Sequence, residues 1–200
     1  MSTADPAPIT LIRHGQTQWS AQGRHTSRTD LPLTDQGEQE ARALGGALAG
    51  YPFAAVLCSP RQRARRTAEL AGLAVTEVLD DLAEWDYGSY EGSTTADIRG
   101  QRPGWDLWRD GCPQGESVAE VGDRLDRVLA RAAELAATGP VAVIGHGHSL
   151  RVGAARWVGL VPDAGALLLL GTATWSRLGY EHGHRAIARW NVAVLPEQQP

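Results

Sequence analysis

The chain has 200 residues, a length typical of one domain rather than two. Its 23 acidic and 19 basic residues give a formal net charge of -4, so it has no basic footprint for nucleic acid or an anionic membrane. All of the basic residues are arginine, which excludes the chemistry of a Schiff-base lysine, a pyridoxal-phosphate anchor or a P-loop. The planar fork of arginine donors does suit a site for phosphate or carboxylate.

The sequence supports neither a cysteine-based metal or disulfide site nor export from the cell. Cys58 and Cys112 form no CxxC pair, which argues against a zinc knuckle, an iron-sulfur cluster or a disulfide framework. The first residues lack the regions of a signal peptide, and no apolar run reaches the roughly 18 residues of a membrane span. We therefore expect a cytoplasmic protein without a membrane partner.

Apolar runs alternate with helical periodicities along the chain, which predicts strands joined by crossover helices. Turn-forming residues and tryptophans crowd between residues 75 and 118, so a third short strand is expected there, followed by a long functional loop region with short helices. Strands are expected at 9–13, 54–58, 141–145, 172–180 and 186–195; helices are expected at 34–49, from a Ser59-Pro60 cap to 71, from a Ser117 capping box to 137, and at 149–159.

The last two predicted strands flank a turn at residues 181–184, which indicates an antiparallel edge. The fold class is therefore α/β, a three-layer α/β/α sandwich with a mostly parallel sheet. We expect one domain over residues 1–200.

Two segments of the chain resemble one another. Arg13-His14-Gly15 follows the first predicted strand, and Gly145-His146-Gly147 closes the fourth. In an open parallel sheet, ligands bind beyond the carboxyl ends of the strands. The sequence therefore predicts two imidazoles that face one pocket.

The first of these segments suits phosphoryl transfer. Arg13 is a fixed cation beside His14, whose neutral imidazole nitrogen can attack phosphorus. Gly15 removes a side chain where a substrate must approach the backbone. Arginines and a protonated His146 would neutralise charge on the transferring oxygens, so no metal is required.

A further cation and a carboxylate complete the candidate set. Arg63 lies near a predicted helix start, where backbone donors favour an anion, although pairing with an acid is the ordinary role of such a residue. Glu84 lies in a glycine-bearing aromatic loop and could protonate a leaving oxygen. Asp86 and Glu91 compete for that role, and capping a turn or pairing with arginine is the alternative for each.

The ordered combination of Arg13-His14-Gly15, Arg63, Glu84 and Gly145-His146-Gly147 resembles the histidine phosphatase superfamily, also called phosphoglycerate mutase-like, over residues 10–194. The resemblance implies that His14 accepts the phosphoryl group, that Arg13, Arg63 and His146 bind it, and that Glu84 donates a proton. It implies a phosphohistidine, hydrolysed by water in phosphatases or returned to substrate in mutases. It implies no metal and no organic cofactor.

Departures from the mutase pattern favour hydrolysis. Residues 24–30 do not match the Arg-Phe-x-Gly-Trp-x-Asp of mutases, and the loop after Glu84 is short for a mutase lid. The chain is more similar to small acid phosphatases and sugar-bisphosphatases, which implies a metal-independent phosphatase for small phosphomonoesters. Further substrate contacts are expected at Ser20, His25, Thr26, Ser27 and Gly147, with simple loop hydrogen bonding as the alternative.

A serine hydrolase is one rival. Gly147-His148-Ser149 nearly spells a nucleophile elbow, with Asp163 and then His182 or His184 in triad order. Arg151 stands where that elbow requires a second glycine, and the rival leaves the Arg13-His14-Gly15 segment without a role.

Other rivals are a mutase, a metal hydrolase and a non-catalytic phosphate-binding protein. His146-x-His148 and His182-x-His184 have a spacing that can bind metal, but no H-E-x-x-H helix accompanies them. A non-catalytic phosphate-binding protein with the same fold remains an alternative, because fold does not determine function. The expected partner is a small phosphorylated metabolite, and a homodimer is left open.

Overall fold

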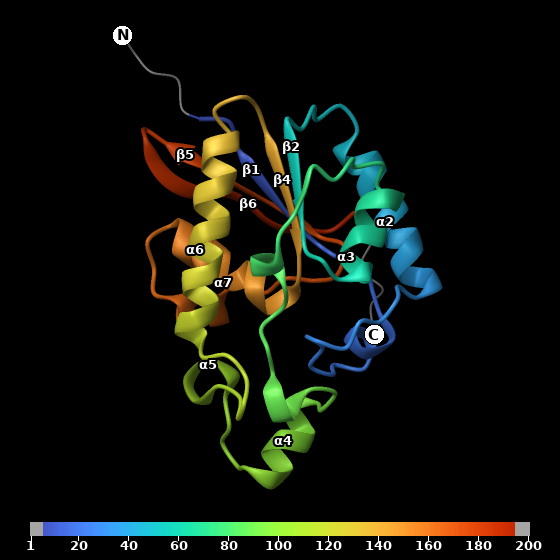
Figure 1. The fold of residues 1–200 in the computed structure, drawn as a ribbon, viewed down its shortest axis with the longest axis vertical. Helices are drawn as coiled ribbons and strands as arrows, with labels where there is room; N and C mark the ends of the chain where they lie inside the picture. The colour runs from blue at the N-terminus through green and yellow to red at the C-terminus, as the bar shows by residue number, and fades with distance from the viewer. Residues whose placement is uncertain (1–5, 195–200) are drawn as a thin grey trace.

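A mixed six-stranded sheet organises the chain in the computed structural model, which describes residues 6–194. Its strand order is β3-β2-β4-β1-β5-β6 (Figure 1). Strands β1 to β4 pair in parallel, whereas β5 and β6 form an antiparallel edge. The strands are β1 (Ile9–Arg13), β2 (Ala55–Cys58), β3 (Glu77–Val78), β4 (Val141–Gly145), β5 (Trp175–Glu181) and β6 (His184–Val192).

Helices cover both faces of this sheet (Figure 1). Side chains of α2 (Asp35–Leu48) and α3 (Gln62–Leu70) pack on one face, and those of α6 (Val118–Leu135) and α7 (Gly147–Trp157) pack on the other. The predicted three-layer α/β/α sandwich is confirmed.

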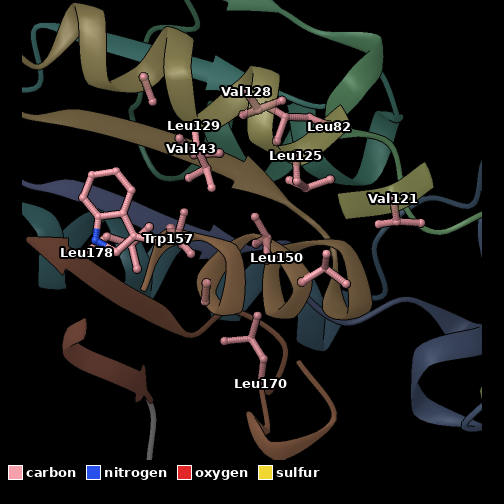
Figure 2. Packing of buried hydrophobic residues seen from close by; sticks show 14 of the residues in the cluster. Leu82, Val121, Leu125, Val128, Leu129, Val143, Leu150, Trp157, Leu170 and Leu178 are labelled. Atoms are coloured by element: carbon pink, nitrogen blue, oxygen red, sulfur yellow. The ribbon is translucent and has the colours of Figure 1, made fainter. Parts of the chain in front are cut away.

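The alternation of side chains along β4 explains how one strand serves both cores. Val143 joins the α6 and α7 cluster, whereas Ile144 joins the α2 and α3 cluster, because successive strand residues point to opposite faces. Figure 2 shows Leu125 of α6 and Leu150 of α7 packed on the first of these cores. Burial of each such leucine stabilises the fold by about 1.5–3 kcal/mol.

Two helix starts differ from the sequence prediction, and both differences involve the candidate site. Helix α3 begins at Gln62 with Arg61, and not Ser59, as its N-cap residue. The Ser59 hydroxyl accepts from the Arg61 N–H at 3.3 Å and also contacts Nε2 of His146 at 2.7 Å. Helix α7 begins at Gly147, two residues earlier than predicted. Its first free N–H groups donate to Glu84, a partner that local sequence does not reveal.

The long loop region lies beyond the carboxyl ends of the parallel strands, where Figure 1 shows α4 and α5 below the sheet. As predicted, it contains short helices. These are η1 (Asp80–Leu82), η2 (Gly88–Tyr90), α4 (Thr95–Gln101) and α5 (Leu107–Asp110), while α1 (Gln18–Ala21) and η3 (Pro162–Leu167) lie in segments where the sequence predicts no helix.

The hairpin between β5 and β6 turns at His182 and Gly183, whose φ angles are 50° and 81°. Positive φ at both positions is typical of a type I′ turn. The last strand ends at Val192 rather than near 195, and residue 195 lies outside the described residues. Among residues 6–194, no helix is long and apolar enough to cross a membrane.

Candidate functional site

Strands β1 and β4 bring the two similar segments together. Arg13 is the register partner of Gly145, so the residues that follow are neighbours, and the ring centroids of His14 and His146 lie 5.0 Å apart. A cavity of about 320 Å³ lies beside His14, which is a volume in the range of small-molecule sites.

The predicted site residues divide into two groups around this cavity. Those that line it are Arg13, His14, Ser20, His25, Thr26, Glu84 and Gly147. The structure does not place Arg63, His146 or Ser27 among its lining residues, and their side chains are buried.

His14 has the tautomer that a nucleophile requires. Its Nδ1 is 2.7 Å from the carbonyl oxygen of Gly15, and because a carbonyl only accepts, Nδ1 carries the hydrogen. The lone pair therefore remains on Nε2. Burial, then the charges of Arg63 and Arg13, hold the pKa of His14 well below its usual range, so the ring is neutral near neutral pH.

Arg13 contacts the backbone at two cavity-lining residues, Leu170 and Gly147. Its guanidinium donates to the carbonyl oxygen of Leu170, and its buried Nε has no hydrogen-bond partner among residues 6–194. A Cβ at Gly147 would lie 3.2 Å from the guanidinium carbon, so the glycine makes room for this side chain. The unsatisfied Nε of Arg13 is a donor that an anion in the cavity could engage.

Arg63 and His146 form a buried hydrogen-bonded pair next to His14. Nε of Arg63 donates to Nδ1 of His146 at 3.2 Å, so Nε2 of His146 carries the hydrogen and donates to Ser59. Burial, then Arg63 and His14, hold the pKa of His146 well below its usual range. These surroundings favour the neutral ring of His146, whereas the sequence analysis expects a protonated one.

The remaining donors of Arg63 hold a loop. Its terminal nitrogens donate to the carbonyl oxygens of Thr26, Ser27 and Thr29. The Ser27 hydroxyl in turn donates to Glu91, which also accepts from the Thr29 N–H at 3.0 Å. Ser27 therefore helps to hold the loop in place. Glu91 fixes the same loop, which agrees with the structural alternative given for it in place of proton donation.

Glu84 is the carboxylate of the three candidates that lines the cavity. Its Oε1 accepts from the N–H groups of Trp85 and Ser149, and its Oε2 accepts from the N–H of His148. These donors fix the carboxylate at the N-terminus of α7. Asp86, by contrast, forms an ion pair with Arg28.

Gly15 has a different role from the expected one. A Cβ at this position would lie 2.4 Å from the carbonyl oxygen of Gly37 in the first turn of α2. The missing side chain therefore permits helix and loop to approach, rather than providing room for a substrate. Its N–H donates to the Thr67 hydroxyl at 3.1 Å, which fixes the loop after His14.

The cavity has a wall that the sequence did not predict as a unit. The Tyr87 hydroxyl lies 2.6 Å from Nδ1 of His148, and the Tyr87 ring lies 4.6 Å from that of His25. Arg151 stacks over Trp108 at 4.7 Å. These residues come from separate segments of the chain, and only tertiary contacts bring them together at the cavity.

The arrangement does not favour the metal and serine rivals. His182 and His184 lie in an exposed hairpin, and within residues 6–194 no group of three or more His, Cys, Asp and Glu side chains could hold a metal ion. Ser149 is fully buried, and its hydroxyl has no hydrogen-bond partner in the described part of the chain. Within residues 6–194 its hydroxyl therefore contacts no base that could activate it.

The buried histidines predict that stability falls with acidity. Burial is the main cause that lowers the pKa values of His14, His25, His146 and His148. Below about pH 6.5 the unfolded chain therefore binds protons that the folded chain does not, and each histidine removes up to about 1.4 kcal/mol of stability per pH unit until its folded pKa is reached. Urea unfolding between about pH 7.5 and 5.5 measures this decline.

His14→Gln should reduce the slope of that decline, whereas a variant of an exposed histidine, His182→Gln, should retain the wild-type slope. A free energy of unfolding that is independent of pH over this window would contradict the burial of neutral imidazoles.

Comparison with known proteins decides the family. The profile of the histidine phosphatase superfamily (branch 1) matches residues 9–193. The chain belongs to this superfamily. The resemblance found in the sequence motifs is confirmed, and the match supports a phosphatase enzyme.

The names of individual relatives agree with this assignment to a phosphatase family. An acid phosphatase of Mycobacterium tuberculosis is 47% identical over 94% of both chains. A sedoheptulose 1,7-bisphosphatase of Saccharomyces cerevisiae is 38% identical over 75% of this chain and 67% of its own. A solved open reading frame product of Mycobacterium tuberculosis superposes with a TM-score of 0.91 at 44% identity, covering 94% of this chain and 99% of that one.

Proposed function

We propose that this histidine phosphatase superfamily member is a metal-independent phosphatase that hydrolyses small phosphomonoesters through a phosphohistidine on His14. The observation that carries the proposal is the state of His14: a neutral ring, with Nδ1 bonded to Gly15 and a free lone pair on Nε2, lining a cavity beside Arg13. The acid phosphatase and bisphosphatase relatives support the substrate class.

In the first step, the Nε2 lone pair of His14 attacks phosphorus, and the bond from phosphorus to the ester oxygen breaks. The departing oxygen takes a proton from the Glu84 carboxyl group, so the alcohol leaves neutral. Arg13 stabilises the transferring oxygens. The anion favours protonation of the neighbouring His146, and we assign stabilisation of that anion to His146 and Arg63.

In the second step, water attacks the phosphohistidine. Glu84, now a carboxylate, accepts a proton from this water, the bond between phosphorus and Nε2 breaks, and phosphate leaves. Glu84 is then protonated and His14 neutral, so the cycle is closed. His14 supplies the nucleophile and Glu84 moves the proton in both steps.

The test is phosphate release in the presence of a chelator from an aryl phosphate, sugar bisphosphates and 3-phosphoglycerate, with a mutase assay in parallel. We expect release that resists the chelator. Isomerisation without release would assign the chain to mutase chemistry, and loss of activity with the chelator would indicate a metal hydrolase. Binding of phosphate esters without any turnover would indicate a binding protein.

A Ser149→Ala variant separates the proposal from a serine hydrolase. We expect phosphatase activity within about threefold of wild type, because the buried hydroxyl makes no hydrogen bond within residues 6–194 and its removal leaves no partner unsatisfied. Steady-state kinetics with an aryl phosphate measure this. Loss of hydrolysis, together with labelling of Ser149 by a fluorophosphonate in the wild type, would support the serine rival.

A further inference from the structure

The arginines around the cavity differ from most others in the chain. Ten of the 19 arginines have a nitrogen within 4.0 Å of a carboxylate oxygen. The arginines that line the cavity have no such partner among residues 6–194; these are Arg13, Arg24, Arg99 and Arg151. Nine arginines therefore have no carboxylate partner within residues 6–194, and four of these nine line this one cavity.

The charge of the cavity is opposite to that of the whole chain. Against these arginines the cavity wall carries two carboxylates, Glu84 and Asp106, while the chain has a net charge of -4. The histidines of the wall do not add charge, because burial lowers their pKa values. A single phosphoryl group bound at His14 and Arg13 would leave the other three cavity arginines without a bound anion.

Arg24 and Arg99 come from two segments that meet at one side of the cavity. Arg24 forms an isolated bridge with Thr94, the N-cap of α4, and Arg99 belongs to α4. Neutral groups hold both side chains. Arg24 donates from NH1 to the Gly92 carbonyl at 2.7 Å and from Nε to Gln22 at 2.9 Å, and Arg99 donates from Nε to the Trp105 carbonyl at 2.9 Å.

Unengaged nitrogens remain on both side chains. Within residues 6–194, NH2 of Arg24 and both terminal nitrogens of Arg99 donate no hydrogen bond. The acidic groups nearby are otherwise engaged: Asp97 bonds to the Thr94 N–H and hydroxyl, and Asp106 caps α5. Both arginines are exposed at the rim of the cavity, and guanidinium nitrogens that donate no hydrogen bond suit an oxyanion.

Arg151 is the alternative and is more fully engaged. Its Nε and NH2 donate to the carbonyl oxygens of Gly165 and Ala166, each at 3.0 Å. Its guanidinium also stacks on Trp108. Its contacts therefore suit a structural part of the wall.

We propose that Arg24 and Arg99 form a second anion subsite, which selects substrates that carry a second phosphate group distant from the one attacked by His14. This inference rests on the proposed phosphatase function and adds a specificity determinant to the same cavity. The distal phosphate contributes binding and not chemistry, so its loss should raise KM more than it lowers kcat.

The test compares fructose 1,6-bisphosphate with fructose 6-phosphate, because the pair differs by one phosphate. Wild type should prefer the bisphosphate in kcat/KM, and the double variant Arg24→Gln/Arg99→Gln should reduce that preference at least about tenfold, mainly through KM. The Arg24→Lys/Arg99→Lys variant should retain part of it, because it keeps the charge but loses the fork. The matched control is Arg189→Gln on β6, an exposed position outside the cavity.

The proposal is overturned if wild type does not prefer the bisphosphate, if the double variant retains the preference, or if Arg151→Gln alone removes it. Comparison of 3-phosphoglycerate with glycerol 3-phosphate shows whether a carboxylate is selected instead of a phosphate, which would also contradict it. Calorimetric binding of both fructose phosphates to His14→Ala keeps the subsite testable without turnover. Binding that depends on Arg24 and Arg99 in an inactive wild type would reject the phosphatase function alone.

Discussion

His14→Ala is expected to lower kcat/KM for phosphate ester hydrolysis by at least about a thousandfold, because removal of a nucleophile eliminates the covalent route and leaves only binding and electrostatic effects. The side chain is buried but makes only one hydrogen bond within residues 6–194, from Nδ1 to Gly15. We expect its loss to cost about 1–3 kcal/mol of stability, as for a typical buried group, so the fold should survive.

Two measurements separate chemistry from folding in this variant. Thermal unfolding reports stability, and mass spectrometry after an alkaline quench detects a phosphoryl adduct on His14 in the wild type. His182→Ala is the matched control, because its side chain is 91% exposed in the β5–β6 hairpin. A His14→Ala activity within tenfold of wild type, or an adduct on another residue, would reject the proposed nucleophile.

Local signals in the sequence were sufficient for most of the fold. The capping box at Ser117 forms as predicted, because both of its hydrogen bonds lie within one turn. The strand β4 has the predicted bounds, because a short apolar run between turn residues specifies a buried strand. The convergence of His14 and His146 followed from their equivalent positions after parallel strands.

The sequence did not predict side-chain contacts between residues that are far apart in the chain. Ser59 lies two residues before the N-cap Arg61, and its hydroxyl contacts both the Arg61 N–H and the ring of His146, 87 residues away. The terminal nitrogens of Arg63 donate to carbonyl groups of the loop at residues 26–29. Nothing local in the sequence specifies these partners. The proximity of Arg24 and Arg99 is not evident from the sequence for the same reason, since only tertiary contacts join α4 to the loop at residue 24.

Glu84→Gln is the second substitution with a large expected effect, and the size of the effect should depend on the substrate. Glutamine cannot donate the proton that an alkoxide needs on leaving, whereas an aryl oxide with a low pKa leaves without that help. We therefore expect a loss of about 10²- to 10⁴-fold in kcat for alkyl phosphates. The loss for a nitrophenyl phosphate should be several-fold smaller in the first step.

Interpretation of this result requires control of the second step, since Glu84 also accepts the proton of the attacking water. Pre-steady-state release of nitrophenol isolates the first step, and steady-state release of phosphate includes both. The first step should be nearly normal with the aryl ester, followed by accumulation of phosphohistidine. Equal losses for alkyl and aryl esters in the first step would show that Glu84 positions the N-terminus of α7, through the N–H groups of His148 and Ser149, rather than moving a proton. Glu91→Gln is the matched control, because this carboxylate fixes the loop at residues 27–29 and should alter both ester classes alike.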